Sequence, residues 1–129
     1  MKIQIDQKQK ALIEKRPIAF ATYGEEGINV VALECCKVVS VNQILLTDNY
    51  MNKTRKNLLE NPKIAIAVWS ADEKEGYQFK GTAQYITSGE WKEKVDVNPD
   101  NEGLAHKAAV LVTVNEIWDL VQPHLIAKE

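Results

Sequence analysis

Alternating apolar and polar positions predict a chain built mainly of β-strands. The clearest alternation runs from Tyr77 to Tyr85, where every second residue is apolar or small and the residues between them are polar. This period of two is typical of a strand with one buried face. Further β-rich runs cover residues 18–22, 28–33, 37–47 (broken at Asn42-Gln43), 63–70 and 108–114. The pattern therefore predicts six β-runs.

Two of these runs are predicted to form a hairpin. Residues 18–22 and 28–33 are separated by a short segment that contains Gly24 and Gly27. Glycine takes positive φ without a steric penalty, and such residues commonly close tight turns between strands.

Two helices are predicted at capping signals. Residues 5–15 have helical spacing, with Asp6 and Gln9 as a capping pair and Arg16-Pro17 as the stop. Thr87 and Glu90 form a T-x-x-E capping box, which predicts a short helix through about Val95. Residues 98–103 then read as a turn-rich loop.

A third helix is predicted between the β-runs at 37–47 and 63–70. Residues 48–61 place Met51, Arg55, Leu58 and Leu59 close to one helical face, and Asn61-Pro62 ends the run. Because the strands follow one another without regular long crossovers, the sheet is expected to be antiparallel with helices at its edges. A six-stranded antiparallel barrel fits this mainly β (α+β) pattern best, since closure removes exposed strand edges.

Composition limits the class of protein. The chain has 129 residues, 45% of them hydrophobic and 26% charged, which predicts one globular domain over residues 1–129. The net charge of −2 and pI of about 5.7 argue against a broad nucleic-acid-binding face. No apolar run approaches the roughly 20 residues that span a bilayer, and the N-terminus lacks a signal-peptide core. We therefore expect a cytoplasmic protein that binds neither nucleic acid nor membranes.

The cysteines and histidines suggest no metal site. Cys35 and Cys36 are neighbours, with Cα atoms ~3.8 Å apart, below the ~4.4 Å usual for a disulfide. On a strand their side chains point to opposite faces, so we interpret them as structural thiols. His106 and His124 add no metal-ligand spacing and are expected to be structural or exposed.

The most informative chemistry lies at residues 52–57, where Lys53, Arg55 and Lys56 crowd the start of a predicted helix. A helix N-terminus carries about half a positive charge, so cations there are disfavoured by about 0.3–1 kcal/mol each. A bound anion such as phosphate would reverse that penalty. The alternative is a solvated basic face, for which screening makes the penalty small. No glycine lies between Gly27 and Gly76, so no glycine-rich nucleotide fingerprint is present.

The order of these elements and motifs resembles the pyridoxamine-phosphate-oxidase-like FMN-binding split barrels over most of the chain. The matching segments are residues 18–22 with Gly24 and Gly27, Lys53-Thr54 with Asn57-Leu58, 61–63, and 79–83. The Lys-Thr pair is the most specific of these. The resemblance implies a six-stranded split β-barrel with short flanking helices and FMN as the cofactor.

The resemblance also implies a set of cofactor-binding residues. Lys53 and Thr54 would hold the flavin phosphate. Asn57 would orient Lys53 or reach the phosphate, or else be a surface asparagine. Backbone groups of Ala32, Leu33 and Glu34 would lie beside the isoalloxazine ring. Thr47 and Asp48 would form the opposite wall.

Members of this family usually pair as two-fold dimers with FMN at the subunit interface, so the resemblance implies a homodimer. The apolar faces of residues 63–70 and 108–120, including Trp69 and Trp118, are candidate interfaces. Core packing is the alternative for both tryptophans. Trp118 is a candidate to lie near the partner's flavin, whereas Trp91 is expected to pack its short helix onto the barrel.

The function implied is that of a small FMN-dependent oxidoreductase, similar to a flavin reductase, with a nicotinamide cofactor or small redox protein as its partner. It is not expected to be a full pyridoxamine-phosphate oxidase, because the sequence ends without the C-terminal arginine and histidine ligands of those enzymes. A non-catalytic FMN carrier or electron-transfer protein is the alternative. A third reading is an OB-like barrel that binds single strands, and relatives of the barrel bind deazaflavin or haem instead.

Overall fold

The computed structural model describes residues 2–15 and 17–129. Helix α1 (Gln7–Lys15) begins at the predicted capping pair: the Gln9 N–H donates to Asp6 Oδ1 at 2.8 Å, and the Asp6 N–H donates to Gln9 Oε1 at 3.0 Å. The predicted cap is therefore confirmed. Arg16, one residue of the predicted stop, lies outside the described residues.

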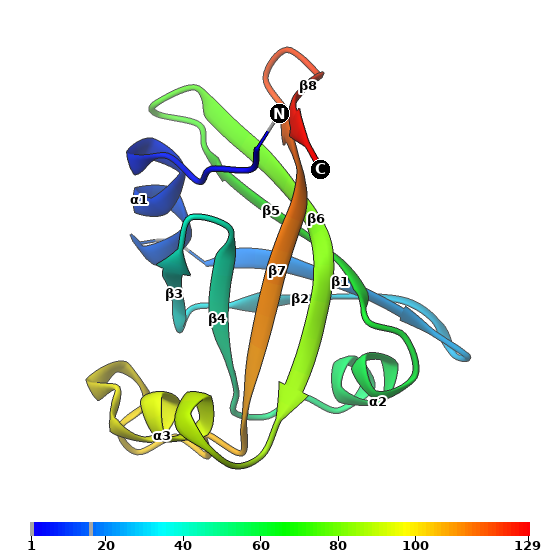
Figure 1. Cartoon of the computed structure of the whole chain (residues 1–129), viewed down its shortest axis with the longest axis vertical. Helices are drawn as coiled ribbons and strands as arrows, with labels where there is room; N and C mark the ends of the chain where they lie inside the picture. The colour runs from blue at the N-terminus through cyan, green and yellow to red at the C-terminus, as the bar shows by residue number, and fades with distance from the viewer. Residues whose placement is uncertain (1, 16) are drawn as a thin grey trace.

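One antiparallel sheet forms the body of the molecule (Figure 1). Its strands are β1 (Ile18–Gly24), β2 (Gly27–Leu33), β3 (Cys36–Ser40), β4 (Gln43–Asp48), β5 (Lys63–Ser70), β6 (Glu75–Ile86), β7 (Ala108–Asp119) and β8 (His124–Lys128). They follow the order β2-β1-β5-β6-β7-β4-β3, with β8 paired to β7. The predicted antiparallel barrel with short helices is confirmed.

The described residues contain eight strands rather than six. The run at 37–47 divides into β3 and β4 at a turn, as its break at Asn42-Gln43 suggested. Strand β8 was not predicted, because its residues are mostly exposed and show no regular alternation.

The sheet closes into a barrel that stays open along one side. Strands β2 and β3 stand at opposite ends of the sheet order, yet only Glu34 and Cys35 connect them. The sheet must therefore curl until its two ends meet, and Figure 1 shows β1 and β2 crossing behind β4, β7 and β6. Since β2 pairs only with β1 among the described strands, the barrel is not closed between β2 and the end of the sheet formed by β4 and β3.

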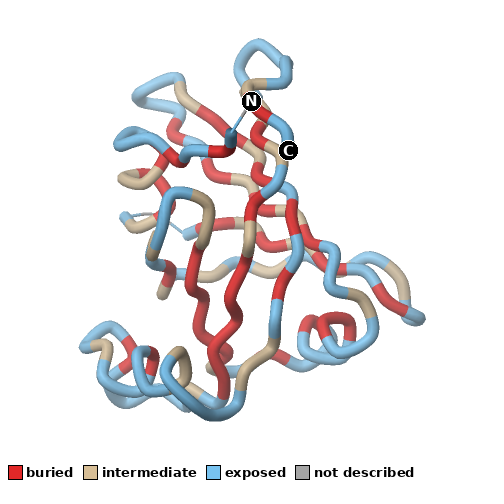
Figure 2. Tube along the Cα trace, viewed as in Figure 1, coloured by how far each residue is buried: buried red, intermediate tan, exposed pale blue. Residues whose placement is uncertain are grey.

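The core fills the inside of this curled sheet, where the buried positions of the strands face one another (Figure 2). Its largest fully buried side chains include Phe20, Phe79 and Ile66, from β1, β6 and β5. A second, smaller cluster lies under helix α3 (Glu90–Val97), where Trp91 packs against Leu45, Val95, Ala109 and Leu111. The expected role of Trp91 is confirmed.

The predicted capping box at Thr87 and Glu90 is wrong. Helix α3 starts at Glu90, its N-cap is Gly89 at φ 92°, and no side chain caps it. Gly89 can take this left-handed conformation and turn the chain directly into the helix, so Glu90 becomes the first residue of the helix instead of the third.

Helix α2 (Lys53–Glu60) is shorter than predicted, because β4 continues to Asp48 and a loop follows it. Its buried residues are Thr54, Asn57 and Leu58, whereas Arg55 and Leu59 are exposed. The predicted apolar face is therefore half confirmed: Leu58 is buried, and so is Met51, which lies just before the helix, whereas Arg55 and Leu59 were wrong. In the described part of the chain, no helix is long and apolar enough to span a membrane.

Candidate functional site

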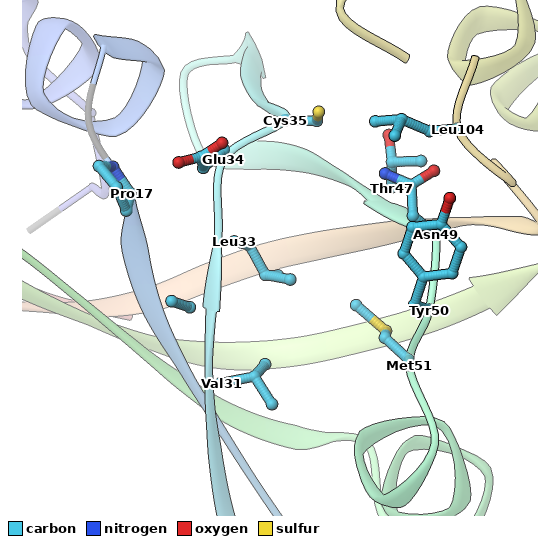
Figure 3. Close-up of a pocket in the computed structure, with 11 residues that line it drawn as sticks. Pro17, Val31, Leu33, Glu34, Cys35, Thr47, Asn49, Tyr50, Met51 and Leu104 are labelled. Carbon is cyan, nitrogen blue, oxygen red and sulfur yellow. The ribbon is translucent and has the colours of Figure 1, made fainter. Parts of the chain in front are cut away.

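A cavity of about 490 Å³ opens where the barrel is split (Figure 3). Three segments line it: the end of β2, the end of β4 with the loop after it, and the segment after a 3₁₀ turn, η1 (Pro99–Asn101). The lining residues are Pro17, Val31, Ala32, Leu33, Glu34, Cys35, Thr47, Asn49, Tyr50, Met51 and Leu104. Small-molecule sites are typically ~300–1,000 Å³ and mostly apolar with a few polar groups. The cavity therefore has the size and lining of a site for an organic ligand.

The first wall is an unpaired strand edge. Strand β2 is hydrogen-bonded to β1 on one side, with Ala32 opposite Ala19 and Leu33 opposite Ile18. In an antiparallel strand alternate residues direct their N–H and C=O groups to the other side, which here has no strand partner among the described residues. The predicted residues Ala32, Leu33 and Glu34 all line the cavity. Their contact with a cofactor stays a prediction.

The second wall contains Thr47 but not Asp48. Asp48 is fully buried, and its carboxylate accepts hydrogen bonds from the Tyr85 hydroxyl at 2.5 Å and from the Met51 N–H at 2.9 Å. Lys107 Nζ lies 3.8 Å from the same carboxylate. Burial, and then the bond to Asp48, raises the pKa of Tyr85 to about 12. Asp48 therefore fixes the loop that carries Met51 into the cavity wall.

The third wall was missed by sequence reasoning, which placed only a turn-rich loop here. The Asn98 side chain accepts from the Asp100 N–H at 3.0 Å and shapes η1. This turn reaches both other walls: the Asp100 carbonyl accepts from Cys35 Sγ at 3.5 Å, and Asn101 Nδ2 donates to Thr47 Oγ1 at 3.0 Å. The Asn98-Pro99 pair signals the turn, but no sequence feature places it over the cavity.

The two cysteines are free thiols on different sides of the chain. Cys36 is buried in the core, and burial raises its pKa to about 12. Cys35 lines the cavity, and burial, followed by the charges of Asp100 and Glu34, raises its pKa as well. A raised pKa disfavours the reactive thiolate. This agrees with the interpretation of both as structural thiols.

The start of α2 lies next to the cavity, two residues beyond Met51. Asn52 provides no side-chain cap, and the first turn contains no acidic residue. Among residues 2–15 and 17–129, no carboxylate pairs with Lys53, Arg55 or Lys56. The Arg55 guanidinium instead lies over the Tyr85 ring, 5.7 Å from its centroid. This helix start therefore carries cations that form no ion pair with a described carboxylate, which favours a bound anion.

Thr54 and Asn57 fasten α2 to the hairpin of β1 and β2. Thr54 Oγ1 accepts from Asn29 Nδ2 at 2.9 Å, while Asn57 Nδ2 donates to Thr22 Oγ1 at 3.1 Å and to the Gly27 carbonyl at 3.4 Å. The Asn57 amide is thus directed to the hairpin rather than to Lys53, and it is buried rather than on the surface. Neither Thr54 nor Asn57 lines the cavity.

Asn29, which sequence reasoning missed, is a polar residue between Ile28 and Val30 on β2. Its interruption of an apolar strand is the only sequence signal for this contact. Asn49, Tyr50 and Met51 were also missed as cavity residues, because the predicted helix covered them. They lie instead in the loop between β4 and α2.

Trp118 is not among the residues that line the cavity of its own chain. It stands on β7 between Gln78 and Leu125, and its Nε1–H donates to Glu116 Oε1 at 3.0 Å. Thr47 pairs with Ala109, nine residues earlier on β7, which corresponds to roughly 30 Å along a strand. Trp118 does not line the cavity of its own chain, and its position near the flavin of a second chain stays a prediction.

Comparison with known proteins agrees with this geometry. A family model described as pyridoxamine 5'-phosphate oxidase matches residues 5–121. Protein MJ0282 of Methanocaldococcus jannaschii is 36% identical over 126 residues, covering 92% of this chain and 82% of the relative. The crystal structure of HupZ from Group A Streptococcus has a TM-score of 0.82 and 26% identity, covering 97% of this chain and 98% of that one. An FMN-binding protein from Syntrophomonas wolfei has a TM-score of 0.71 and 16% identity, with 86% and 82% coverage. Since the family model spans most of the sequence, the chain belongs to the pyridoxamine 5'-phosphate oxidase family.

Proposed function

We propose that this protein is a flavoprotein that binds FMN in the split of the barrel, with the ring in the cavity and the phosphate at the start of α2. The observation that carries the proposal is the position of the un-neutralised helix start beside the apolar cavity of about 490 Å³. The fold shared with the FMN-binding protein of Syntrophomonas wolfei supports it.

The residues around the site fit this cofactor. Lys53 and the free N–H groups of the first turn of α2 would bind the phosphate. The Thr54 side chain is buried and its Oγ1 accepts from Asn29, so Thr54 would contribute by fixing the start of α2 beside the phosphate. The unpaired edge of β2 offers backbone groups to the polar edge of the ring, and Met51 and Leu104 offer apolar contact. Asn57 acts by holding α2 in place.

We further propose that the protein is a small oxidoreductase. Bound FMN would supply the hydride or electron transfer. The protein's residues would bind the cofactor, orient it and exclude water. The alternative, a carrier without turnover, is distinguished by mixing the FMN-loaded protein with NADH or NADPH. Bleaching of the bound flavin and turnover with an added acceptor support the enzyme; reduction by a chemical donor alone supports the carrier.

A homodimer is part of the proposal. The outer face of β2, β1 and β5 is apolar and exposed, with Ile28, Val30, Tyr23 and Trp69 all more than half exposed. A groove of about 420 Å³ on this face shares Pro17, Val31 and Ala32 with the cofactor cavity. A second chain on this face would therefore also cover the bound cofactor, and its Trp118 is our candidate for the covering residue. The cytoplasmic location stays a prediction.

The first test is the chromophore. Protein as purified, or after incubation with FMN, should show a flavin absorption spectrum, and mass spectrometry of the released molecule should identify FMN. If the released molecule is a deazaflavin or haem, FMN is the wrong cofactor, but the assignment of the cavity as the cofactor site still holds. Binding of none of these molecules would overturn the proposed function.

The second test separates the phosphate from the ring. Lys53→Ala should weaken FMN binding by about 1.5–3 kcal/mol, because a hydrogen bond between two charged groups is lost. Binding of riboflavin, which has no phosphate, should not change. Lys56→Ala is the matched control, since Lys56 lies on the same helix but lines a different groove with Glu25, Glu26 and Glu60. Equal losses for both variants, or for both ligands, would contradict the phosphate site.

A further inference from the structure

A chain of hydrogen bonds connects η1 to the cavity. Asn101 is fully buried, and its Nδ2 donates to the Val95 carbonyl at 2.8 Å and to Thr47 Oγ1 at 3.0 Å. Thr47 lines the cavity and is 5% exposed. The Asn101 amide therefore stands directly behind a hydroxyl of the proposed cofactor site.

The direction of these hydrogen bonds is determined by Val95. A backbone carbonyl can only accept, so the group of Asn101 that faces it must be the amide nitrogen. The opposite orientation would place Oδ1 against the carbonyl oxygen, with no donor between them. Because the same nitrogen faces Thr47, Thr47 Oγ1 must accept as well.

This leaves the single hydroxyl proton of Thr47 without an acceptor in the described part of the chain. Asn101 uses both protons of its amide nitrogen, and its own Oδ1 is buried without a partner. A buried polar atom without a hydrogen-bond partner is rare in native proteins, so both groups call for an explanation. Thr47 is one of the residues that line the cavity, where a ligand acceptor could take the proton.

We infer that Asn101 is a positioning residue that orients the Thr47 hydroxyl as a hydrogen-bond donor toward the ligand. This inference rests on the proposed FMN site. The flavin ring carries carbonyl oxygens and ring nitrogens that accept such a bond. With Asn101 in place the hydroxyl is oriented before the ligand arrives, so binding does not have to restrict its rotation.

The test is a cycle of variants read out by FMN affinity, measured from flavin fluorescence. Thr47→Val, which keeps the shape but removes the hydroxyl, should weaken binding about three- to tenfold, as for one neutral hydrogen bond. Thr47→Ser should restore it. Asn101→Ala should weaken binding by up to the same factor, and adding it to Thr47→Val should cause no further loss.

A spectrum separates positioning from mere structural support. The long-wavelength absorption band of the bound flavin should shift in the same direction in Thr47→Val and Asn101→Ala, because both remove the same oriented donor. Asn101→Ser is a second variant in case Asn101→Ala does not fold. It keeps a small polar side chain, but serine is too short to reach Thr47 from this position, so it should also weaken binding.

The outcomes distinguish this inference from the proposed function. If the wild-type protein binds no flavin, the proposed function fails, and the inference fails with it. If the wild-type protein binds FMN but Thr47→Val binds it equally well with the same spectrum, only the inference is overturned. Losses that add in the double variant, or wild-type binding by Asn101→Ser, would likewise overturn it.

Discussion

At the residue scale, Gly81 determines how closely the two long strands β6 and β7 pack. Strands β6 and β7 shift register between Lys80 and Gly81. A Cβ atom at Gly81 would lie 2.0 Å from the Thr113 carbonyl oxygen, which belongs to the backbone and cannot rotate away. The absence of a side chain thus allows β6 to approach β7 closely, where β7 changes partner from β4 to β8.

Gly81→Ala should lower the free energy of unfolding by about 3 kcal/mol or more, because the added methyl must displace backbone. Denaturant unfolding measures this. Gly76→Ala on the same strand is the control: its Cβ would meet its nearest atom, Leu120 Cβ, at 3.4 Å, so a change below about 1 kcal/mol is expected. A wild-type stability for Gly81→Ala would show that the strands can separate at this point without cost.

The ionisation of the Tyr85 hydroxyl makes the stability of the fold depend on pH. Its pKa is about 12 in the folded chain, owing to burial and the bond to Asp48, whereas an unfolded tyrosine ionises near ~10. Between these pH values the folded chain holds more protons than the unfolded chain. The stability contributed by Tyr85 is therefore fully present below pH ~10 and is lost as the pH rises towards about 12.

Tyr85→Phe should flatten the alkaline fall in stability, measured by urea unfolding at a series of pH values. At neutral pH it should cost about 1.5 kcal/mol, because Asp48 loses a hydrogen bond. Tyr50→Phe, at a ring 72% exposed, should leave the stability at neutral pH unchanged. An alkaline fall as steep in Tyr85→Phe as in the wild type would contradict the assignment.

At the scale of elements, α2 is held by polar contacts. Thr54 and Asn57 are buried on the helix face that meets the hairpin and bond to Asn29, Thr22 and Gly27. A Cβ at Gly24 would lie 2.2 Å from Asn57 Oδ1, so the hairpin also approaches the helix closely. This explains why apolar spacing identified only part of the buried face of α2: beside Leu58, that face contains the polar residues Thr54 and Asn57, which are satisfied by hydrogen bonds.

Asn57→Ala should therefore lower the free energy of unfolding by about 2–3 kcal/mol, since buried hydrogen bonds are lost and their partners stay unpaired. It should also weaken FMN binding, because the start of α2 is no longer held against β2. Thermal unfolding and FMN titration measure the two effects. Lys56→Ala, exposed on the same helix, should change neither. Unchanged FMN affinity in Asn57→Ala would show that α2 is positioned by other contacts.

At the scale of the whole molecule, the split of the barrel and the exposed face of β2, β1 and β5 lie side by side. They share Pro17, Val31 and Ala32. Association of two chains in the proposed dimer would bury the apolar face and close the cofactor cavity at the same time. Oligomeric state and cofactor affinity should then be coupled.

Trp69→Glu should convert the dimer to a monomer and weaken FMN binding, because it places a charge on the exposed outer face of β5. Analytical ultracentrifugation with and without FMN tests this. Val97→Glu is the control, since Val97 is 78% exposed at the end of α3, away from the sheet face. A wild-type protein that is monomeric at all concentrations would refute the dimer.

Much of the fold could be predicted from the sequence because it depends on local pattern. Alternation along residues 77–85 identified β6, and the Asp6–Gln9 cap identified the start of α1. The prediction of a capping box at Thr87 and Glu90 was wrong because Gly89 takes a left-handed conformation, which the capping rule does not consider. Strand β8 was missed because its pairing with β7, rather than its own residues, makes it a strand.

The sequence by itself determined most of the strand pattern, the antiparallel barrel and the cluster of cations around Lys53, since period and charge are properties of neighbouring residues. Only the structure showed that no described carboxylate pairs with these cations. The tertiary structure alone decided which residues share the cavity. Glu34 and Leu104 are 70 positions apart, and only the curling of the sheet brings their segments together. It also decided that Asp48 faces the core and that Asn101 stands behind Thr47, because hydrogen-bond direction depends on distant partners that no local pattern records.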